Sequence, residues 1–264
     1  MILIRPCCGF DELEACVRLQ IETWGYDESD VIPRKAFRVA QRIGGQVFGA
    51  FDTDIPGSPL EGGPDSTVGF LFSLPGVKVA KPEPWPYLHS HMLAVKGSYR
   101  NRGLGTKLKL EQRKEALSRG IRHIEWTFDP LEIKNAFLNI HKLGAIARSY
   151  EADFYGVSSS RLQGGLPTDR LVAEWELDSP RVKAILSGRP TGECKVEDRI
   201  MVPASIYEWK ATEAGRDRAL AVQLENRRRF QLAFSQGLAT LSFVRDAEGN
   251  GVFELGRLST PEQH

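Results

Sequence analysis

The chain has 264 residues, of which 41% are hydrophobic and 26% are charged, and its formal net charge is +1 at pH 7. A chain of this length forms one large domain or one domain with an extension, and the composition is that of an ordinary globular protein. A net charge near zero provides no overall field for nucleic acid or an anionic membrane, which disfavours both as partners.

Short strands and helices are predicted to alternate in the N-terminal part of the chain. Asp11 is the expected N-cap of the first helix, and Pro33 fits the first turn of the second. The prolines between residues 75 and 86 are expected to exclude regular structure, so this segment is either a lid over an acceptor groove or a connector. The elements predicted up to residue 74 are a strand at 1–5, helices at 11–24 and 33–43, and strands at 46–51 and 67–74.

The middle of the chain is predicted to continue this alternation. Gly120 and Gly144 are expected to end the two helices of the region. The predicted elements are a strand at 88–95, a helix at 104–119, a strand at 121–128, a helix at 133–142, and strands at 146–155 and 171–177 around a long loop. This order predicts an α/β (α+β) fold in which a mixed, mostly antiparallel central sheet is flanked by helices.

A break at 178–198, rich in Ser, Gly and Pro, is expected to precede a C-terminal α/β extension. The extension has a predicted long helix at 211–236 and a hairpin of strands at 238–244 and 252–255. The apolar face expected on the helix consists of Leu220, Leu224, Phe230 and Phe234. We therefore expect one domain over residues 1–178, followed by a linker and the extension over 179–264.

The four cysteines indicate a reducing compartment. Cys7 and Cys8 are adjacent, which does not fit a zinc CxxC spacing, and Cys16 and Cys194 complete a set too sparse for a disulfide scaffold. The first residues contain too short an apolar run for a signal peptide, and no apolar stretch approaches the length of a membrane span. These features predict a cytoplasmic protein with reduced thiols.

A glycine-bearing turn between the predicted strand 88–95 and helix 104–119 carries the clearest functional signal. Its sequence is Arg100-Asn101-Arg102-Gly103-Leu104-Gly105-Thr106. Glycines let the backbone approach a ligand closely, and the unpaired amides at a helix start favour an anion. The two arginines add charge and hydrogen-bond donors, so a diphosphate is the expected occupant.

Residues 93–106 resemble the GNAT superfamily of CoA-dependent N-acyltransferases over their whole length. The family pattern is an apolar strand, a short polar link, and then Arg/Gln-x-x-Gly-x-Gly/Ala at the start of a helix. The order of predicted elements over residues 1–177 is similar to the GNAT fold. Residues 135–144 resemble the later helix of the family, which bears an Asn and ends in a Gly turn. The resemblance covers about two thirds of the chain.

The resemblance implies acetyl-CoA or another acyl-CoA as co-substrate, and direct attack of an amine on its thioester. It implies that the backbone of Leu93 and Val95 pairs with the pantetheine arm, and that the Leu93 amide polarises the thioester carbonyl. Asn135 would bond the cofactor arm. The pyrophosphate would be held by the amides of Arg100, Asn101, Arg102, Gly103, Leu104, Gly105 and Thr106.

One position departs from the family pattern. GNAT members often carry a Tyr about four residues before the Gly of the late helix, where it protonates the leaving thiolate, and this chain has Ile140. Either another group supplies the proton or the thiolate leaves unassisted. Tyr150 and Tyr155 on the next predicted strand are substitutes by residue type only.

Two histidines are the candidate bases for an amine acceptor. His89 and His91 fall on one face of the predicted strand, and an imidazole titrates near neutral pH. Some GNAT members place a catalytic Glu at the spacing of His89, which makes His89 the first choice. The alternative is two strand histidines bonded to their neighbours. Two histidines with no third ligand nearby do not predict a metal site.

Candidate acceptor-binding residues lie later in the chain. Asp129 either binds an acceptor ammonium or caps a turn. Arg170 or Arg161 either clamps an acceptor carboxylate or belongs to a solvated ion pair. The arginines at 227–229 are expected to form a solvated helix face.

The expected function is transfer of an acetyl or succinyl group from acyl-CoA to the amine of a small molecule, with an amino acid as the favoured acceptor. The chain resembles, more loosely, a long GNAT-like subgroup linked with N-acylation of amino acids. The alternatives are a protein or peptide N-acetyltransferase and a CoA-binding sensor without turnover. The acyl group, the role of the extension and a homodimeric state are left open.

Overall fold

The computed structural model describes residues 1–79, 83–191 and 195–258, so that Pro82 and Cys194 lie outside the described residues. The chain forms two compact units. The N-terminal unit comprises Met1–Glu125 with Ser159–Arg161, and the C-terminal unit comprises Trp126–Ser158 and the described residues from Leu162 onward. Within the described ranges, no helix is long and apolar enough to cross a membrane.

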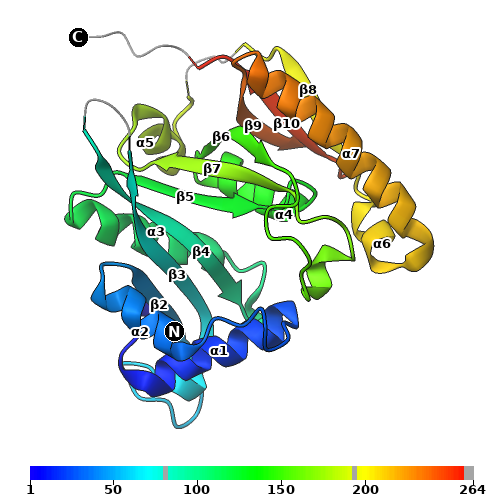
Figure 1. Ribbon diagram of the computed structural model, residues 1–264. Helices are drawn as coiled ribbons and strands as arrows, with labels where there is room; N and C mark the ends of the chain where they lie inside the picture. The colour runs from blue at the N-terminus through cyan, green and yellow to red at the C-terminus, as the bar shows by residue number, and fades with distance from the viewer. Residues whose placement is uncertain (80–82, 192–194, 259–264) are drawn as a thin grey trace. The chain divides into compact units, whose positions relative to one another are not determined.

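The N-terminal unit contains a sheet in the order β1-β2-β3-β4-β5 (Figure 1). Its first four strands pair antiparallel, and the start of β5 pairs parallel to β4. The strands are β1 (Ile2–Pro6), β2 (Gln46–Asp52), β3 (Thr67–Lys78), β4 (Trp85–Val95) and β5 (His123–Phe128), the last of which begins in this unit.

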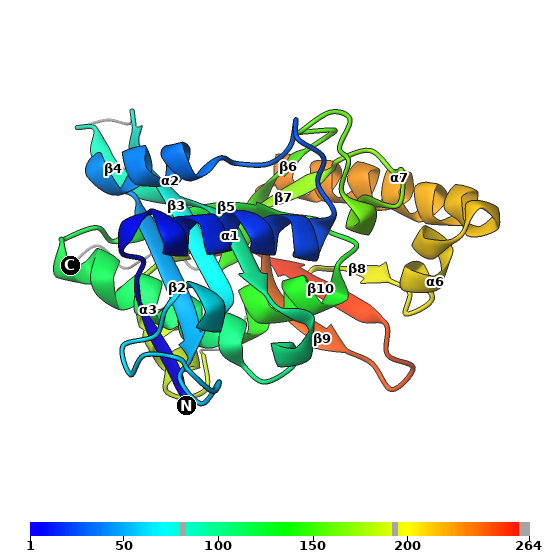
Figure 2. The same cartoon turned by 90° about the horizontal axis from the view of Figure 1, so that it is seen from below.

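Helices cover both faces of this N-terminal sheet. On one face lie α1 (Gly9–Trp24) and α2 (Arg34–Arg42), and α1 crosses β2 and β3 (Figure 2). Their apolar side chains pack on Phe70 and Phe72 of β3. On the other face, α3 (Leu104–Ser118) packs through Leu104 and Leu108 against Leu71 of β3. Alternate β3 side chains therefore enter the two cores, as the period of a strand requires.

The C-terminal unit contains antiparallel strands in the order β7-β6-β9-β10-β8. They are β6 (Ile146–Glu151), β7 (Arg170–Glu176), β8 (Asp198–Val202), β9 (Ala239–Arg245) and β10 (Gly251–Gly256). The helices are α4 (Ile133–Ala136), continued by a π-helical turn at Phe137–Lys142, α5 (Pro180–Leu186), α6 (Ile206–Ala211) and α7 (Glu213–Ser235). Phe230 of α7 stacks on Tyr150 and meets Phe253 edge-on, at 5.7 and 5.2 Å between ring centroids. In Figure 1, α7 runs alongside β8 and β10.

The prediction that prolines exclude structure from residues 75–86 is wrong at both ends. Pro75 lies in β3 opposite Leu88, and Pro86 lies in β4 opposite Val77. Pairing of β3 with β2 ends at Ser73, and pairing of β4 with β5 begins at Leu88. Each proline thus lies where its strand has a partner on one side, which is where a missing N–H is tolerated.

Two helix starts differ from their predictions. The first helix begins at Gly9 after the N-cap Cys8, so Asp11 lies inside its first turn. The predicted break at 178–198 contains α5, because Ser179 Oγ accepts a hydrogen bond from the Val182 amide at 3.2 Å and Pro180 occupies the first turn. Serine followed by proline is a helix-start signal, and it was missed because the surrounding Ser, Gly and Pro residues indicated a break.

The predicted helix at 211–236 is two helices, and its expected apolar face is partly wrong. The helices separate at Thr212, whose hydroxyl caps α7 by accepting from the Gly215 amide at 3.2 Å. Leu224 is 46% exposed. The buried stripe instead includes Gln223 and Asn226, which donate to the carbonyls of Pro167 and Met201 at 2.8 and 3.1 Å respectively. Each of these buried amides donates a hydrogen bond to a backbone carbonyl, which allows a polar side chain on the buried stripe, so apolar spacing alone misplaced the face.

Candidate functional site

The turn between β4 and α3 has the backbone of an anion-binding site. Asn101 and Gly103 have positive φ angles of 62° and 76°. Gly103 is the N-cap of α3 and makes no side-chain cap, and the first turn of α3 contains no acidic residue. The first amides of a helix have no intrahelical acceptor and lie at its positive end. With neither a cap side chain nor a carboxylate, this helix start favours an external anion.

The side chains of the turn anchor it to the neighbouring strands. Arg100 Nε donates to the carbonyl of Val95 at 3.0 Å. The Arg102 guanidinium lies 5.4 Å from the Tyr99 ring centroid. The Tyr99 hydroxyl donates to Asp52 Oδ2 at 2.6 Å, and this bond lowers the pKa of Asp52 while raising the pKa of Tyr99. The turn is therefore held against the end of β2.

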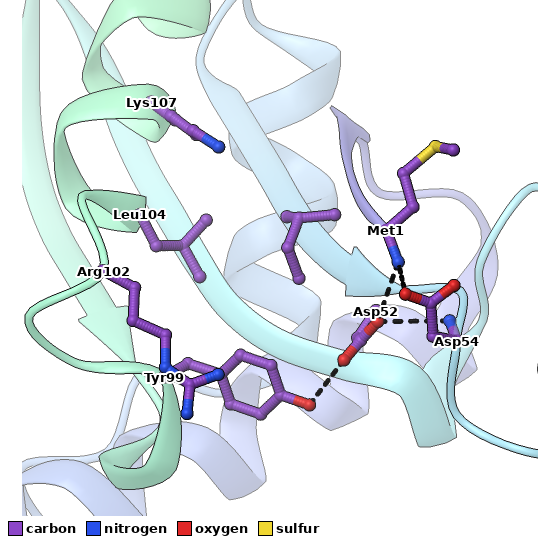
Figure 3. A pocket seen from close by; sticks show the side chains of 8 residues that line it. Met1, Asp52, Asp54, Tyr99, Arg102, Leu104 and Lys107 are labelled. Carbon is purple, nitrogen blue, oxygen red and sulfur yellow. Dashed lines mark hydrogen bonds and ion pairs between the residues drawn. The ribbon is translucent and has the colours of Figure 1, made fainter.

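A pocket of about 230 Å³ borders the turn. Figure 3 shows Arg102 and Lys107 on the side of α3 and Asp52 and Asp54 near the start of β1. Its full lining is Met1, Ile2, Asp52, Asp54, Tyr99, Arg102, Leu104 and Lys107. Both signs of charge line the pocket, so it has no uniform field for one ligand charge.

A β-bulge interrupts β4 at His91. Phe72 is paired with Met92 and Ser73 with Ser90, which leaves His91 without a residue opposite. The bulge changes the face that alternate side chains occupy: Ser90 accepts from Lys109 of α3 at 2.8 Å, whereas Met92 joins the core beneath α1 and α2. Bulges of this kind are common beside functional sites because they redirect a strand edge.

Downstream of the bulge, β4 leaves its β5 partner. Of the residues that the structure describes, the β4–β5 ladder pairs Leu88 with Ile124 and His89 with Glu125. β4 continues to Val95, and its residues Leu93 and Val95 fall beyond this ladder. An unpaired strand edge offers backbone groups to an extended ligand.

His89 and His91 share a face, as predicted, with their ring centroids 5.8 Å apart. His91 also meets the Phe72 ring edge-on at 5.9 Å. Burial first, and His89 second, lower the pKa of His91 to about 4. His91 is therefore neutral at pH 7, and its ring belongs to the edge of the core beneath α1 and α2.

Sequence reasoning missed Glu125, which lies directly beside His89. Glu125 Oε1 is 3.8 Å from His89 Nδ1, and Oε2 forms an ion pair with Lys78 and lies 3.8 Å from His123 Nε2. Burial acts to raise the pKa of Glu125, but His123, His89 and Lys78 outweigh it and lower the pKa well below its usual range. The sequence signal for Glu125 was the alternation of side chains along β4 and β5. That alternation places Glu125 beside His89 only once the parallel register of the two strands is known.

The remaining predicted residues lie in the C-terminal unit. Asn135 is exposed in α4, and Ile140 is buried in the π-helical turn that follows. Asp129 accepts from the Leu131 amide at 2.8 Å and lies 2.8 Å from Lys210 Nζ. An acceptor ammonium would have to displace Lys210, so the turn-cap reading of Asp129 agrees better with these contacts.

Arg170 is half-buried on β7 and is held by neutral groups. It donates to the Asp169 carbonyl at 2.8 Å and to Gln163 Oε1 at 3.2 Å, and its guanidinium lies 5.2 Å from the Tyr155 ring centroid. In the described part of the chain, no carboxylate is paired with it. The alternative candidate Arg161 belongs to the N-terminal unit, where its side chain lies against Gly25.

The Asp169 carboxylate is occupied by a different arginine. Arg227 forms two hydrogen bonds to it, at 2.7 and 2.8 Å, and Tyr150 donates to it at 2.6 Å. The expectation of a solvated face at 227–229 is therefore wrong for Arg227. Burial, followed by Asp169, raises the pKa of Tyr150, which makes this phenol a poor acid. Tyr155 is 43% exposed and shares a 2.8 Å hydrogen bond with Thr127.

No protein-family model matches the chain, and no curated protein sequence matches it. Solved structures do match. Arabidopsis thaliana NAA60 in complex with acetyl-CoA aligns with a TM-score of 0.54 and 15% identity, over 68% of this chain and 100% of that chain. The same protein in complex with a bisubstrate analogue aligns with a TM-score of 0.50 and 15% identity, over 66% and 98%. The chain has the GNAT fold.

This result confirms the predicted fold class, including a mixed and mostly antiparallel strand arrangement flanked by helices. The aligned 66–68% leaves room for an extension beyond the GNAT fold, and the boundary at residue 178 stays a prediction. The N-terminal unit brings together the turn, the free part of β4 and the two histidines, whereas Asn135, Asp129 and Arg170 belong to the C-terminal unit. Among the described residues, no group of three or more His, Cys, Asp or Glu side chains is arranged to hold a metal.

Proposed function

We propose that the protein is a CoA-dependent N-acyltransferase whose acyl-CoA pyrophosphate binds at the start of α3. The observation that carries the proposal is the turn at 100–106. Two left-handed residues, Asn101 and Gly103, precede a helix start that has neither a capping side chain nor an acidic first turn. A diphosphate would complete the hydrogen bonds of the helix amides and interact favourably with the helix dipole.

The free part of β4 supports the same proposal. The pantetheine arm would pair with the backbone of Leu93 and Val95 as an added strand. The Leu93 N–H would stabilise the oxyanion that forms when the acceptor amine attacks the thioester. The new C–N bond then forms, the C–S bond breaks, and the thiolate leaves as free CoA after protonation. His89 is the proposed base for the proton of the amine.

The acceptor is proposed to be a small-molecule amine with a carboxylate, most simply an amino acid. Arg170 supports this choice because its guanidinium is half-buried and bonded to neutral oxygens. Such a group can bind a carboxylate in bidentate geometry without first breaking an internal ion pair. The donated group is proposed to be acetyl or succinyl.

A non-catalytic CoA-binding module is the second candidate. It is favoured by Ile140, which is 1% exposed and apolar where the family often carries an acidic Tyr. A binder without turnover would need no general acid. The peptide N-acetyltransferase alternative has no observation of its own in this chain.

Thiol release from acetyl-CoA and succinyl-CoA, measured against L- and D-amino acids, polyamines and peptides, distinguishes these functions. We expect turnover with amino acids. Tight CoA binding without thiol release on the whole panel would favour the binding module, and turnover confined to peptides would move the acceptor to a protein chain.

Gly105→Glu tests the pyrophosphate site directly. A carboxylate in the first turn of α3 interacts favourably with the helix dipole, so the fold should survive. The same carboxylate would occupy the anion position, and we expect CoA affinity measured by calorimetry to fall by more than about 100-fold. Leu110→Glu places a carboxylate on an exposed position further along α3 and is the matched control. Unchanged CoA affinity in Gly105→Glu would contradict the proposed site.

A further inference from the structure

A cluster of titratable side chains surrounds Glu125 in the N-terminal unit. Lys78 comes from β3, Tyr87 and His89 from β4, and His123 from β5 itself. The carboxylate forms an ion pair with Lys78 and lies 3.8 Å from a nitrogen of each histidine. Burial raises the pKa of Tyr87, and the nearby Glu125 adds to this effect. Five polar groups therefore converge where a sheet interior is ordinarily apolar.

The strand register fixes the contact between His89 and Glu125. The two residues are direct partners in the parallel ladder of β4 and β5, so their side chains leave the same face of the sheet side by side. The Glu125 side chain is 11% exposed, whereas that of His89 is 23% exposed. The carboxylate is thus the inner member of the pair, and the imidazole is the outer member that a substrate can reach.

We propose that Glu125 is the positioning residue that orients His89 as the proton acceptor of the acyl-transfer reaction. The proposal rests on the proposed function. Nδ1 is the His89 nitrogen that faces Glu125, so the carboxylate favours the tautomer with a proton on Nδ1. Nε2 then carries the lone pair. A carboxylate behind an imidazole also stabilises the imidazolium that forms when Nε2 takes a proton.

The reaction balances with this assignment. The acceptor ammonium gives one proton to His89 Nε2, and the freed amine forms the C–N bond as the C–S bond breaks. The second proton of the attacking nitrogen passes through water to the thiolate, and the imidazolium returns its proton to solvent. Glu125 stays ionised throughout, because Lys78 pairs with it and holds its pKa low together with the two histidines.

The charge of Lys78 acts on the His89 imidazolium in the opposite direction to the charge of Glu125. Its ammonium pairs with the same carboxylate and lies 4.9 Å from the Tyr87 ring centroid. Removing Lys78 would leave the full charge of Glu125 to His89, whereas removing Glu125 would leave His89 near an unpaired ammonium. Among the other described titratable groups of this region, His91 lies 5.8 Å from His89 between ring centroids, and Tyr87 and His123 lie beside Glu125.

Two variants with opposite expected effects test the proposal. In Glu125→Gln we expect kcat/KM for the acceptor to fall about tenfold while KM for acyl-CoA is unchanged. The acidic limb of the kcat/KM profile should move to lower pH, because the imidazolium loses its carboxylate. In Lys78→Met the same limb should move to higher pH. Glu111→Gln changes an exposed carboxylate to an amide on α3 and should leave the profile unchanged.

A second measurement does not depend on turnover. Nitrogen-15 NMR of the imidazole side chains should show His89 mainly with a proton on Nδ1 in the wild-type chain and as a tautomer mixture in Glu125→Gln. Wild-type tautomer in the variant, or acidic limbs that do not move in opposite directions, would make Glu125 a structural ion-pair partner only. Absence of thiol release in the wild type contradicts the proposed function instead, and the tautomer measurement still decides the role of Glu125.

Discussion

Behind the histidines of β4 lies a lysine that the protein buries almost completely. Lys109 is 3% exposed, and its ammonium donates to Ser90 Oγ at 2.8 Å and to Gln112 Oε1 at 3.3 Å. Both oxygens are neutral. Burial lowers the pKa of Lys109 well below its ordinary value, because the charged form loses its hydration. This side chain makes the stability of the N-terminal unit dependent on pH.

The pH dependence of unfolding should change in Lys109→Met. Between the lowered folded pKa and about pH 10.4, the unfolded lysine binds a proton that the folded lysine releases. The wild-type free energy of unfolding should therefore rise with pH in this range, and the variant should lack that component. At pH 7 the variant should be at least as stable, since methionine fills the site without a charge.

Urea unfolding at several pH values between neutral and about pH 10 provides the measurement. Lys114→Met is the control, because the Lys114 side chain is 79% exposed. Equal pH slopes in the wild type and in Lys109→Met would show that Lys109 keeps an ordinary proton affinity in the folded chain.

At the scale of elements, the turn before α3 depends on the left-handed conformation of Asn101. Asn tolerates a positive φ better than other non-glycine residues, whereas a β-branched side chain does not. Asn101→Val should reduce the free energy of unfolding by about 1–2 kcal/mol and weaken CoA binding. Asn101→Gly should keep both properties near the wild type. Chemical denaturation and calorimetry test this, and equal behaviour of the two variants would contradict a conformational role.

Local patterns predicted the elements that local interactions determine. The strand and helix on either side of the turn, and the shared face of His89 and His91, follow from alternation and from glycine positions. Glu125 could not be predicted, because its place beside His89 depends on the parallel register of two strands that are distant in sequence. The strand positions of Pro75 and Pro86 depend likewise on where neighbouring strands end.

On the scale of the whole chain, the predicted boundary at residue 178 crosses a shared core. In the C-terminal unit, Asp169 is paired with Arg227, and Asp129 is paired with Lys210. The Asp169 side chain has no exposed surface, and the Lys210 side chain is 6% exposed. Each pair joins a residue before the boundary to one after it. Residues after the predicted boundary therefore supply the counter-charges of two acids that precede it.

A chain that ends at residue 178 should not fold cooperatively. It would keep Asp169 and Asp129 and lose both cations, and loss of one partner of a buried ion pair costs about 3–5 kcal/mol. It would also expose the ring of Tyr150 that Phe230 covers. Calorimetric melting and near-ultraviolet circular dichroism measure the result. A chain that ends at 258 keeps the described contacts and is the control; native-like melting of the shorter chain would show that residues 1–178 are autonomous.

Because of the bulge at His91, odd-numbered side chains of β4 lie on one face of the sheet before the bulge and on the other face after it. Tyr87 and His89 before the bulge lie on the same face as Met92 after it, which is the face covered by α1 and α2. In a regular strand, residues an odd number of positions apart would lie on opposite faces. Leu93 and Val95 consequently pack toward α3. Insertion or deletion of one residue at the bulge would move every side chain in one half of β4 to the opposite face of the sheet. A substitution at His91 would leave all the other side chains on their present faces. The upstream half of β4 carries the proposed base His89, and the downstream half carries the proposed pantetheine edge. Side chains in the two halves can therefore change independently, but the number of residues between the halves must stay the same.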